Sequence, residues 1–416
     1  MSRRQRTTIG REGIYYLLVV AFVVTGAVLR EVNLLLVVAG MMLFPFLLNW
    51  RTVVVGMRDL TVRRRFPEAV RAGDLLVVDI ELRKQPKRLG RRSSTGRVLC
   101  VRDRIEVAHS RELVAEPTLM FWQVAPGKAR RLRYRGRIAR RGRYRLGPLL
   151  VSSRFPLGLV QRTVEIPASD TVFVLPRQGH LTRGWSRLYS DARTGARTSR
   201  QKHGLLEGDF HSLRDWRPGD SLRRIHWRTT ARRGSPVVRQ FERRTEQDLM
   251  LLVDLWQPRP AARGDLRHVE RAVSFAATVA EDVCERGNSE LSIGVAGQQL
   301  RSAQGAAAPA LLREVMQILA EAEASTQPPL PELLRKAVAA ARPGMLLLLI
   351  SPRRLALGDA QQFAEVTLAT GPRGAARQIM TIHTGRELSE FFVEPGLAGR
   401  NEHDELGEMM VERAAP

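Results

Sequence analysis

The chain has 416 residues, of which 44% are hydrophobic and 26% are charged, a composition typical of folded protein and not of a disordered chain. This length exceeds what a single hydrophobic core usually supports, so two or three domains are expected. The two cysteines, Cys100 and Cys284, are far apart and fit a reducing compartment. A disulfide framework and a cysteine metal site are therefore excluded.

The net charge of +25 is concentrated in the first part of the chain. From Leu266 onward there are 15 basic and 19 acidic residues, whereas the first 265 residues carry a net charge of +29. A basic segment beside a membrane anchor is attracted to anionic lipid headgroups. Nucleic acid is a second anionic partner. We favour the membrane surface, or a merely solvated basic face, over nucleic acid.

Two uncharged apolar runs lie near the N-terminus, at 13–29 and 32–50. Each is about long enough to cross a hydrocarbon core of roughly 30 Å. Only Arg30 and Glu31 separate them, so the sequence predicts two transmembrane helices in a tight hairpin within residues 1–50. A cleaved signal peptide does not fit, because the run is paired and no small-residue cleavage site precedes its partner.

The arginines around these runs predict the orientation of the hairpin. The residues that flank its two outer ends are Arg3, Arg4, Arg6 and Arg11 before the first run, and Arg51, Arg58, Arg63, Arg64 and Arg65 after the second. The turn offers only Arg30. Cytoplasmic flanks of membrane helices are enriched in cations. We therefore expect a multi-pass protein of the bacterial inner membrane with both termini in the cytoplasm.

Residues 51–175 alternate apolar side chains with arginine in short segments, as in 75–83, 96–107 and 128–140. Period-two alternation with turn residues between the segments predicts antiparallel strands. The sequence therefore predicts a β-sandwich-like domain with one basic face. We interpret that face as solvated first and as a binding surface second.

The most distinctive stretch is 208–242, within a connecting segment at 176–245. It predicts a polar loop, a turn at Arg217-Pro218-Gly219-Asp220 and a helix from about Ser221 to Arg232, capped by Asp220. Ile225 and Trp227 are expected to point inward. Asp215 and Asp220 have many guanidinium neighbours, which favours a fixed salt-bridge network.

This stretch resembles the signature of the family called domain of unknown function 58. The matching elements are an Arg–x–Trp–x–Pro–Gly–Asp turn, an Ile–x–Trp and an Ala–Arg, at Arg214, Trp216, Pro218, Gly219, Asp220, Ile225, Trp227, Ala231 and Arg232. The paired apolar runs and the segments 140–144 and 155–159 look similar as well. The resemblance implies a bacterial membrane protein whose C-terminal domain is related to von Willebrand factor A. It also implies MoxR-type AAA+ ATPases as partners and no clear enzymatic activity.

Residues 246–395 alternate apolar strands with amphipathic helices. Strands are predicted at 248–254, 290–295, 345–351 and 378–383, with a hairpin partner at 298–302. Helices are predicted at 267–286, 309–323, 331–341 and 359–370. Fully apolar strands between helices indicate a doubly wound, mainly parallel α/β sheet. An acidic tail, residues 396–416, is expected to be solvated.

An intact von Willebrand A-like domain would hold Mg²⁺ with an Asp–x–Ser–x–Ser loop, a Thr and a second Asp. Here Asp254 matches, but Trp256 and Pro258 replace both hydroxyls, and Thr326 is the only weak Thr candidate. One oxygen ligand does not hold Mg²⁺. We therefore predict no metal site and no cofactor, with Asp254 held by nearby amides.

The sequence thus predicts a multidomain, non-enzymatic scaffold or adaptor that engages a protein partner, with an AAA+ ATPase as the implied one. The signature residues, together with Asp215 between Arg214 and Trp216, are either its docking surface or an internal hinge. An enzyme acting on a cell-envelope substrate, for instance a hydrolase, is the alternative. It would use His211, Asp215, Asp220 or His226. A metal site at His203, His211 and His226 is disfavoured because no matching ligand pair follows. Anionic-lipid or nucleic-acid binding by the basic half is a further alternative.

Overall fold

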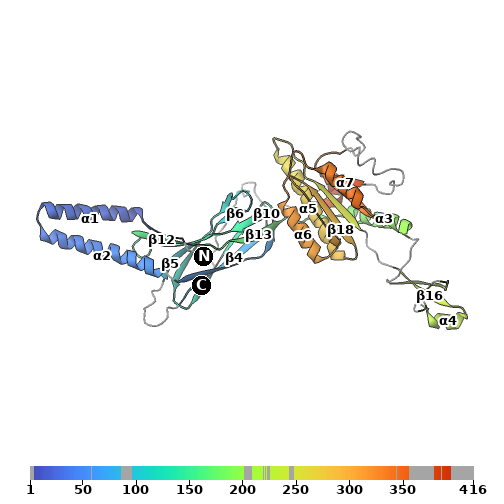
Figure 1. Cartoon of the computed structure of the whole chain (residues 1–416), viewed down its shortest axis with the longest axis horizontal. Helices are drawn as coiled ribbons and strands as arrows, with labels where there is room; N and C mark the ends of the chain where they lie inside the picture. Colours follow the sequence, from blue (N-terminus) through green and yellow to red (C-terminus); the bar gives the residue numbers. More distant parts are fainter. Residues whose placement is uncertain are drawn as a thin grey trace. The chain divides into compact units, whose positions relative to one another are not determined.

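A computed structural model of the chain describes residues 4–57, 59–85, 96–200, 209–242 except 219, 221, 223 and 224, 248–342, 344–355, 379–385 and 387–394. The chain divides into two compact units, the first ending at Leu175 and the second beginning at Pro176. The predicted helix 359–370 and the tail 396–416 lie outside the described residues. Figure 1 shows the elements of both units.

Two long apolar helices open the first unit and lie side by side in Figure 1. Helix α1 spans Arg11–Leu29 and α2 spans Asn33–Gly56, and both are long and apolar enough to cross a membrane. Helix α2 continues six residues past the predicted end at Trp50. Thr52 bonds back to the carbonyl of Leu48 at 2.7 Å, and Lys84 donates to the carbonyl of Gly56 at 2.8 Å, which satisfies a carbonyl in the last turn.

Three sheets make up the rest of the first unit. The strands of the first sheet, in spatial order, are β1 (Gln5–Ile9), β12 (Val160–Ile166), β11 (Leu149–Ser153), β5 (Gly96–Arg102) and β8 (Thr118–Val124). Those of the second sheet are β3 (Ala69–Arg71), β13 (Asp170–Leu175), β10 (Gly142–Leu146), β6 (Ile105–Val107) and β7 (Leu113–Ala115). Those of the third sheet are β2 (Leu60–Arg65), β4 (Leu75–Lys84) and β9 (Ala129–Arg137). Neighbouring strands are antiparallel except β13 and β3, which are parallel.

One hydrophobic core serves all three sheets, with members such as Ile80 of β4, Leu99 of β5 and Leu146 of β10. Along β4 the buried residues alternate, as the sequence pattern predicted. The opposite face carries cross-strand ion pairs, among them Arg133 to Asp79 at 2.7 Å. The alternating arginines of β9 thus lie on a solvated sheet face.

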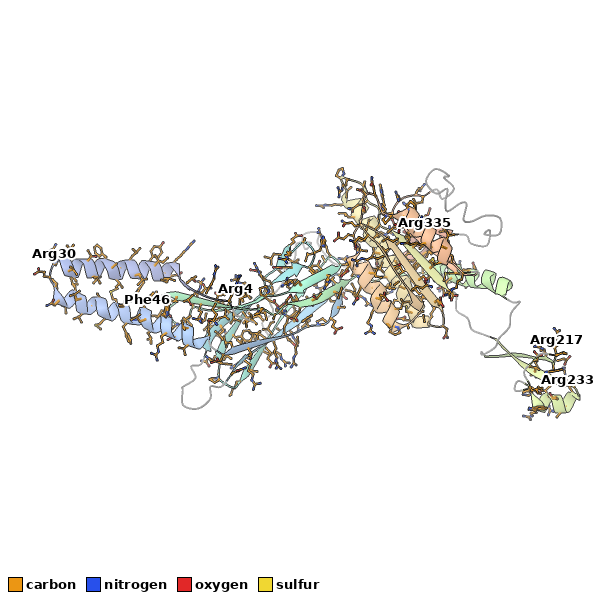
Figure 2. The ribbon with its side chains drawn as sticks, in the orientation of Figure 1. Arg4, Arg30, Phe46, Arg217, Arg233 and Arg335 are labelled. Atoms are coloured by element: carbon orange, nitrogen blue, oxygen red, sulfur yellow. The ribbon has the colours of Figure 1, made fainter. Side chains whose placement is uncertain are left out.

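The N-terminal strand β1 was not predicted. It precedes α1 and pairs with β12 from Gln5 opposite Val164 to Ile9 opposite Val160. Because β1 leads into α1 and α2 leads toward β2, both outer ends of the helical hairpin lie at the β-sheets. Figure 2 labels Arg4 beside the sheets and Arg30 at the turn between the helices.

The second unit is built on a five-stranded sheet in the order β19, β18, β17, β20, β21. Its elements are β17 (Leu249–Asp254), α5 (Arg263–Arg286), β18 (Glu290–Ala296), β19 (Leu300–Ala306), α6 (Pro309–Glu321), α7 (Leu330–Ala340), β20 (Leu346–Ser351) and β21 (Ile379–His383). All pairs are parallel except the β18–β19 hairpin. Every residue of β17 is buried, as expected for a central strand covered on both faces.

The beginning and end of the second unit are joined by a short ladder. Strand β14 (His180–Leu181) pairs with β22 (Phe392–Val393), which follows α9 (Leu388–Phe391). Helix α3 (Arg183–Arg200) then buries Trp185 edge-on against Phe275 of α5, with ring centroids 5.8 Å apart. The start of the predicted connecting segment 176–245 is therefore part of this unit and not a simple linker.

Candidate functional site

The signature residues form a small hairpin module, residues 209–242. Strands β15 (Asp209–Asp215) and β16 (Val237–Glu242) pair antiparallel and enclose helix α4 (Trp227–Arg233). Ile225 forms a further bridge with Val238, and its side chain is buried together with those of Val237 and Val238. So small an apolar core explains why polar bonds carry much of the local structure.

Asp220 fixes the turn by accepting three hydrogen bonds. The two terminal nitrogens of Arg214 bind its carboxylate at 2.6 and 2.7 Å, and the backbone N–H of Arg217 donates at 2.9 Å. The Asp220 N–H donates in turn to the Arg217 carbonyl at 3.0 Å, which closes the turn around Pro218. Hydrogen bonds from Arg214 and Arg217 lower the pKa of Asp220 to about 2. Gly219 lies outside the described residues.

The predicted helix from Ser221 to Arg232 is described only in part: Leu222 lies in a 3₁₀ turn, and Ser221, Arg223 and Arg224 lie outside the described residues. Helix α4 begins at Trp227, and its cap is His226, whose Nδ1 accepts from the Thr229 N–H at 3.3 Å. The Asp220 carboxylate does not cap α4; it accepts hydrogen bonds from the Arg214 side chain and the Arg217 N–H. Gly234, with φ of +70°, ends the helix in the left-handed conformation.

The prediction that Ile225 and Trp227 both point inward is only half right. Ile225 is 8% exposed, whereas Trp227 is 68% exposed and Leu222 is 67% exposed. The indole of Trp216 is half-buried and donates to the Asp220 carbonyl at 3.3 Å, so this tryptophan does stabilise the turn. The module thus keeps one tryptophan for its own fold and presents the other.

Cations surround the exposed tryptophan in the sequence of α4. Arg232 and Arg233 occupy the last turn and are exposed, and Figure 2 labels Arg233 and Arg217 on the module. Arg233 lies 3.9 Å from Asp215, whose side chain is 77% exposed. Asp215 is therefore not part of a fixed network like that of Asp220.

The residues of the enzyme alternative are engaged in structural roles or exposed. Asp220 is bonded to Arg214, His226 caps α4, and Asp215 is exposed. The side chain of His211 and the whole of His203 lie outside the described residues. Among Asp215, Asp220 and His226 the described geometry pairs no acid with a base.

A second polar cluster lies where β17 and β20 end, at the carboxyl edge of the five-stranded sheet. The Oδ2 atom of Asp254 accepts from the Ser351 hydroxyl at 2.8 Å and from Arg353 Nε at 3.0 Å. The Arg353 guanidinium lies 5.4 Å from the ring centroid of Trp256. Strand order reverses between these two strands, which is where open α/β sheets bind ligands.

This cluster does not fit Mg²⁺. The groups around Asp254 are a hydroxyl and a guanidinium, and the guanidinium itself supplies a positive charge. Within the described residues no three His, Cys, Asp or Glu side chains are grouped as metal ligands. Thr326 follows Ser325, whose backbone pairs with Leu255 and Gln257. The prediction that amides hold Asp254 is wrong, because Ser351 and Arg353 do so.

Burial raises the pKa of Asp254, against the opposing effects of Arg353 and the Ser351 hydroxyl. Its second oxygen, Oδ1, is buried and has no hydrogen-bond partner among the described residues. Sequence reasoning missed Arg353. The signal was available in Ser351-Pro352-Arg353, where a cation follows the strand adjacent to that of Asp254.

The architecture defines a class: a multidomain chain with two apolar N-terminal helices, an antiparallel β region and an α/β sheet that carries a hairpin module. The family described as "Protein of unknown function DUF58" matches residues 212–351, which include most of the hairpin module and the sheet through β20. The chain is similar to that family over these residues.

A similar curated protein is the "Uncharacterized protein YeaD" of Bacillus subtilis (strain 168), 28% identical over 148 residues. The match covers 35% of this chain and spans about a third of that relative, 34% of its length. Among solved structures, the CARDB domain of the PF1109 protein from Pyrococcus furiosus is 17% identical with a TM-score of 0.20, covering 28% of this chain and 92% of that domain. A β-glucosidase from Kluyveromyces marxianus is 11% identical with a TM-score of 0.15, and the match covers 28% of this chain and 15% of that enzyme. Such TM-scores support no inference.

Proposed function

We propose that this protein is a non-enzymatic scaffold of the bacterial inner membrane that engages a protein partner through the hairpin module. The observation that carries the proposal is the exposure of Trp227 on a module whose turn is fixed by Arg214 and Asp220. Tryptophan and arginine are the residues most enriched among those that dominate binding energies. A stiff turn lowers the entropy lost when such residues bind.

The size of the module supports docking. A two-stranded hairpin is marginally stable on its own, and this one buries few apolar side chains. Leu222 and Trp227 would add apolar area once covered. Arg217, Arg232 and Arg233 favour an acidic surface on the partner. A MoxR-type AAA+ ATPase is the partner we propose, on the strength of the family resemblance.

The membrane anchor of this proposal is the α1–α2 hairpin. Its surface is largely apolar and exposed, for example at Phe22, which is 81% exposed. Both outer ends lie at the β-sheets because β1 pairs with β12. Since the cations flank those ends and only Arg30 lies at the turn, we propose that both units face the cytoplasm. In right-side-out vesicles we expect both units to be protected from added protease. Cleavage within the sheets would contradict the proposed orientation.

We further propose that the five-stranded sheet is a von Willebrand A-like domain without its metal. The parallel order with a β18–β19 hairpin at one edge supports this proposal. In place of a divalent cation, Arg353 neutralises Asp254. The sheet would then not act as a metal-dependent adhesion site.

The test is a crosslinked pull-down of the tagged full-length protein from its native membrane. Trp227→Ala and Asp220→Ala are compared with two matched controls, Trp122→Ala and Asp215→Ala. Trp122 is 61% exposed on β8, and Asp215 is 77% exposed and makes only a 3.9 Å contact with the exposed Arg233 among its described ion pairs. We expect an AAA+ ATPase with the parent and both controls but not with the other two variants.

All variants are first shown to insert in the membrane and to unfold at the parent temperature. Equal recovery of the ATPase with Trp227→Ala and the parent would sink the docking role of the module. Recovery of no ATPase with any of the proteins, including the parent, would remove this partner from the proposal.

A further inference from the structure

The β region of the first unit contacts the base of the helical hairpin through the segment 154–159, here called the base loop. Leu159 and Val160 are buried together with Phe46 of α2, and Tyr16 and Leu17 of α1 pack on the same cluster. Figure 2 labels Phe46 on α2. The loop is therefore part of the surface that the two helices share.

Backbone bonds fix the base loop to both helices. The Gly10 N–H, just before α1, donates to the Leu159 carbonyl at 2.9 Å, and the Leu157 N–H donates to Asn49 Oδ1 of α2 at 3.1 Å. A Cβ on Gly13 would lie 2.1 Å from the Leu159 carbonyl oxygen, so only glycine permits this approach. The side chain of Asn49 is fully buried by the contact.

The contact lies inside the apolar runs and not beyond them. Gly13 begins the first uncharged run, and Phe46 precedes the end of the second, Trp50, by four residues. At about 1.5 Å of rise per residue, the contact at Phe46 lies about 6 Å inside the apolar length of α2. If the runs span the hydrocarbon core, this depth is the boundary between headgroups and acyl chains.

The side chains of the base loop match that boundary. Leu157 is 51% exposed at the tip of the loop although its backbone is fixed. Arg154 in the loop and Arg11 at the start of α1 are exposed cations. An apolar tip with flanking cations suits the interface, where the leucine contacts acyl chains and the guanidinium groups bind lipid phosphates.

We propose that the base loop is a third membrane-contacting element, with Leu157 immersed at the interface of a phospholipid bilayer. The inference rests on the proposed membrane anchor and is independent of the hairpin module. Phe46 of α2 and Leu159 of the base loop lie in one buried cluster, so the loop packs directly on the apolar helices. The occupant of the exposed face is therefore the lipid that already surrounds the helices.

The experiment places a single cysteine-linked fluorophore at Leu157, Phe22 or Leu113 in a full-length background with Cys100→Ser and Cys284→Ala. Leu113, on β7 of another sheet, is 49% exposed and matches Leu157 in accessibility. The proteins are reconstituted in vesicles of phosphatidylcholine and phosphatidylglycerol that carry acyl-chain nitroxide quenchers. We expect strong quenching at Phe22 and Leu157, several-fold above that at Leu113.

The three positions separate the ways to fail. Quenching at Phe22 without quenching at Leu157 overturns the inference and leaves the anchor intact. No quenching at Phe22 overturns the anchor and the inference together. A photocrosslinking residue at Leu157 in the otherwise natural chain repeats the test without cysteine removal, and crosslinks to lipid are the expected result. Crosslinks to protein alone contradict the inference.

Discussion

Each of the two units contains an aspartate whose carboxylate is bound by two nitrogens of one arginine. The two ion pairs differ in how deeply they are buried. In the β region Arg64 binds Asp103 at 2.6 and 2.9 Å, with side chains 1% and 2% exposed. In the hairpin module Arg214 binds Asp220 at 2.6 and 2.7 Å, with side chains 35% and 21% exposed. Both pairs are bidentate, Arg64 through Nε and one terminal nitrogen and Arg214 through its two terminal nitrogens, and their surroundings differ.

Burial reverses the direction of the pKa shift. Desolvation raises the pKa of Asp103, although Arg64 and the Tyr134 hydroxyl oppose it. Hydrogen bonds lower the pKa of Asp220 to about 2, because water still surrounds the pair. An ion pair that is taken out of water joins sheets, whereas one left in water shapes a turn.

The largest effect is expected from Arg64→Met. It would leave Asp103 buried without its cation and would also release Asp170, which Arg64 binds at 2.6 Å. Loss of one partner of a buried pair costs about 3–5 kcal/mol in the free energy of unfolding. Thermal unfolding of the detergent-solubilised protein measures it. A loss as small as that of a surface pair would mean that water reaches the cluster.

A smaller loss is expected from Arg353→Met, because Arg353 is partly exposed and Asp254 keeps Ser351. A buried acceptor without its donor costs about 1–3 kcal/mol. Burial raises the folded pKa of Asp254 above its ordinary value of 3.8. The variant should therefore lose stability as the pH rises from about 3.8 through the higher folded pKa. Unfolding curves at several pH values check the sign, and a loss that grows toward acid would contradict it.

Asp79→Asn tests an exposed cross-strand pair on the basic face. Arg133 binds Asp79 at 2.7 Å, and because water screens this exposed pair, its loss should lower the free energy of unfolding far less than Arg64→Met does. Thermal unfolding beside Arg64→Met gives the contrast directly. Similar losses in the two variants would mean that burial does not determine how much each ion pair stabilises the fold.

The smallest global effect is expected from acid on the hairpin module. The folded pKa of Asp220, about 2, lies below its ordinary 3.8, so its contribution is present above pH 3.8 and fades as the pH falls toward 2. The Arg217 amide, which donates to Asp220, should shift in NMR over that range. A shift centred near pH 4 would mean that the Arg214 fork is open in solution.

The sequence predicted elements with strong periodicity and missed those defined by distant partners. The fully apolar run of β17 and the alternation of β4 sufficed to place both strands. Strand β1 is short and mostly exposed, so only its register with β12 identifies it. In the signature the sequence predicted an ion-paired Asp220, but only the structure selects Arg214 from the neighbouring arginines as its partner. Arg353 was missed for the same reason.

The pairing of β1 with β12 constrains the order in which the parts of the chain can fold during synthesis. Arg162 bonds to Thr7 across 155 residues of chain, so the first strand cannot be completed until long after both apolar helices have left the ribosome. The second unit repeats the delay, since Thr182 bonds to the Glu390 carbonyl across 208 residues. In the proposed membrane protein, the two apolar helices could therefore enter the bilayer before these long-range contacts form. The β1–β12 pairing and the β14–β22 pairing can therefore form only after the chain between their strands has been synthesised.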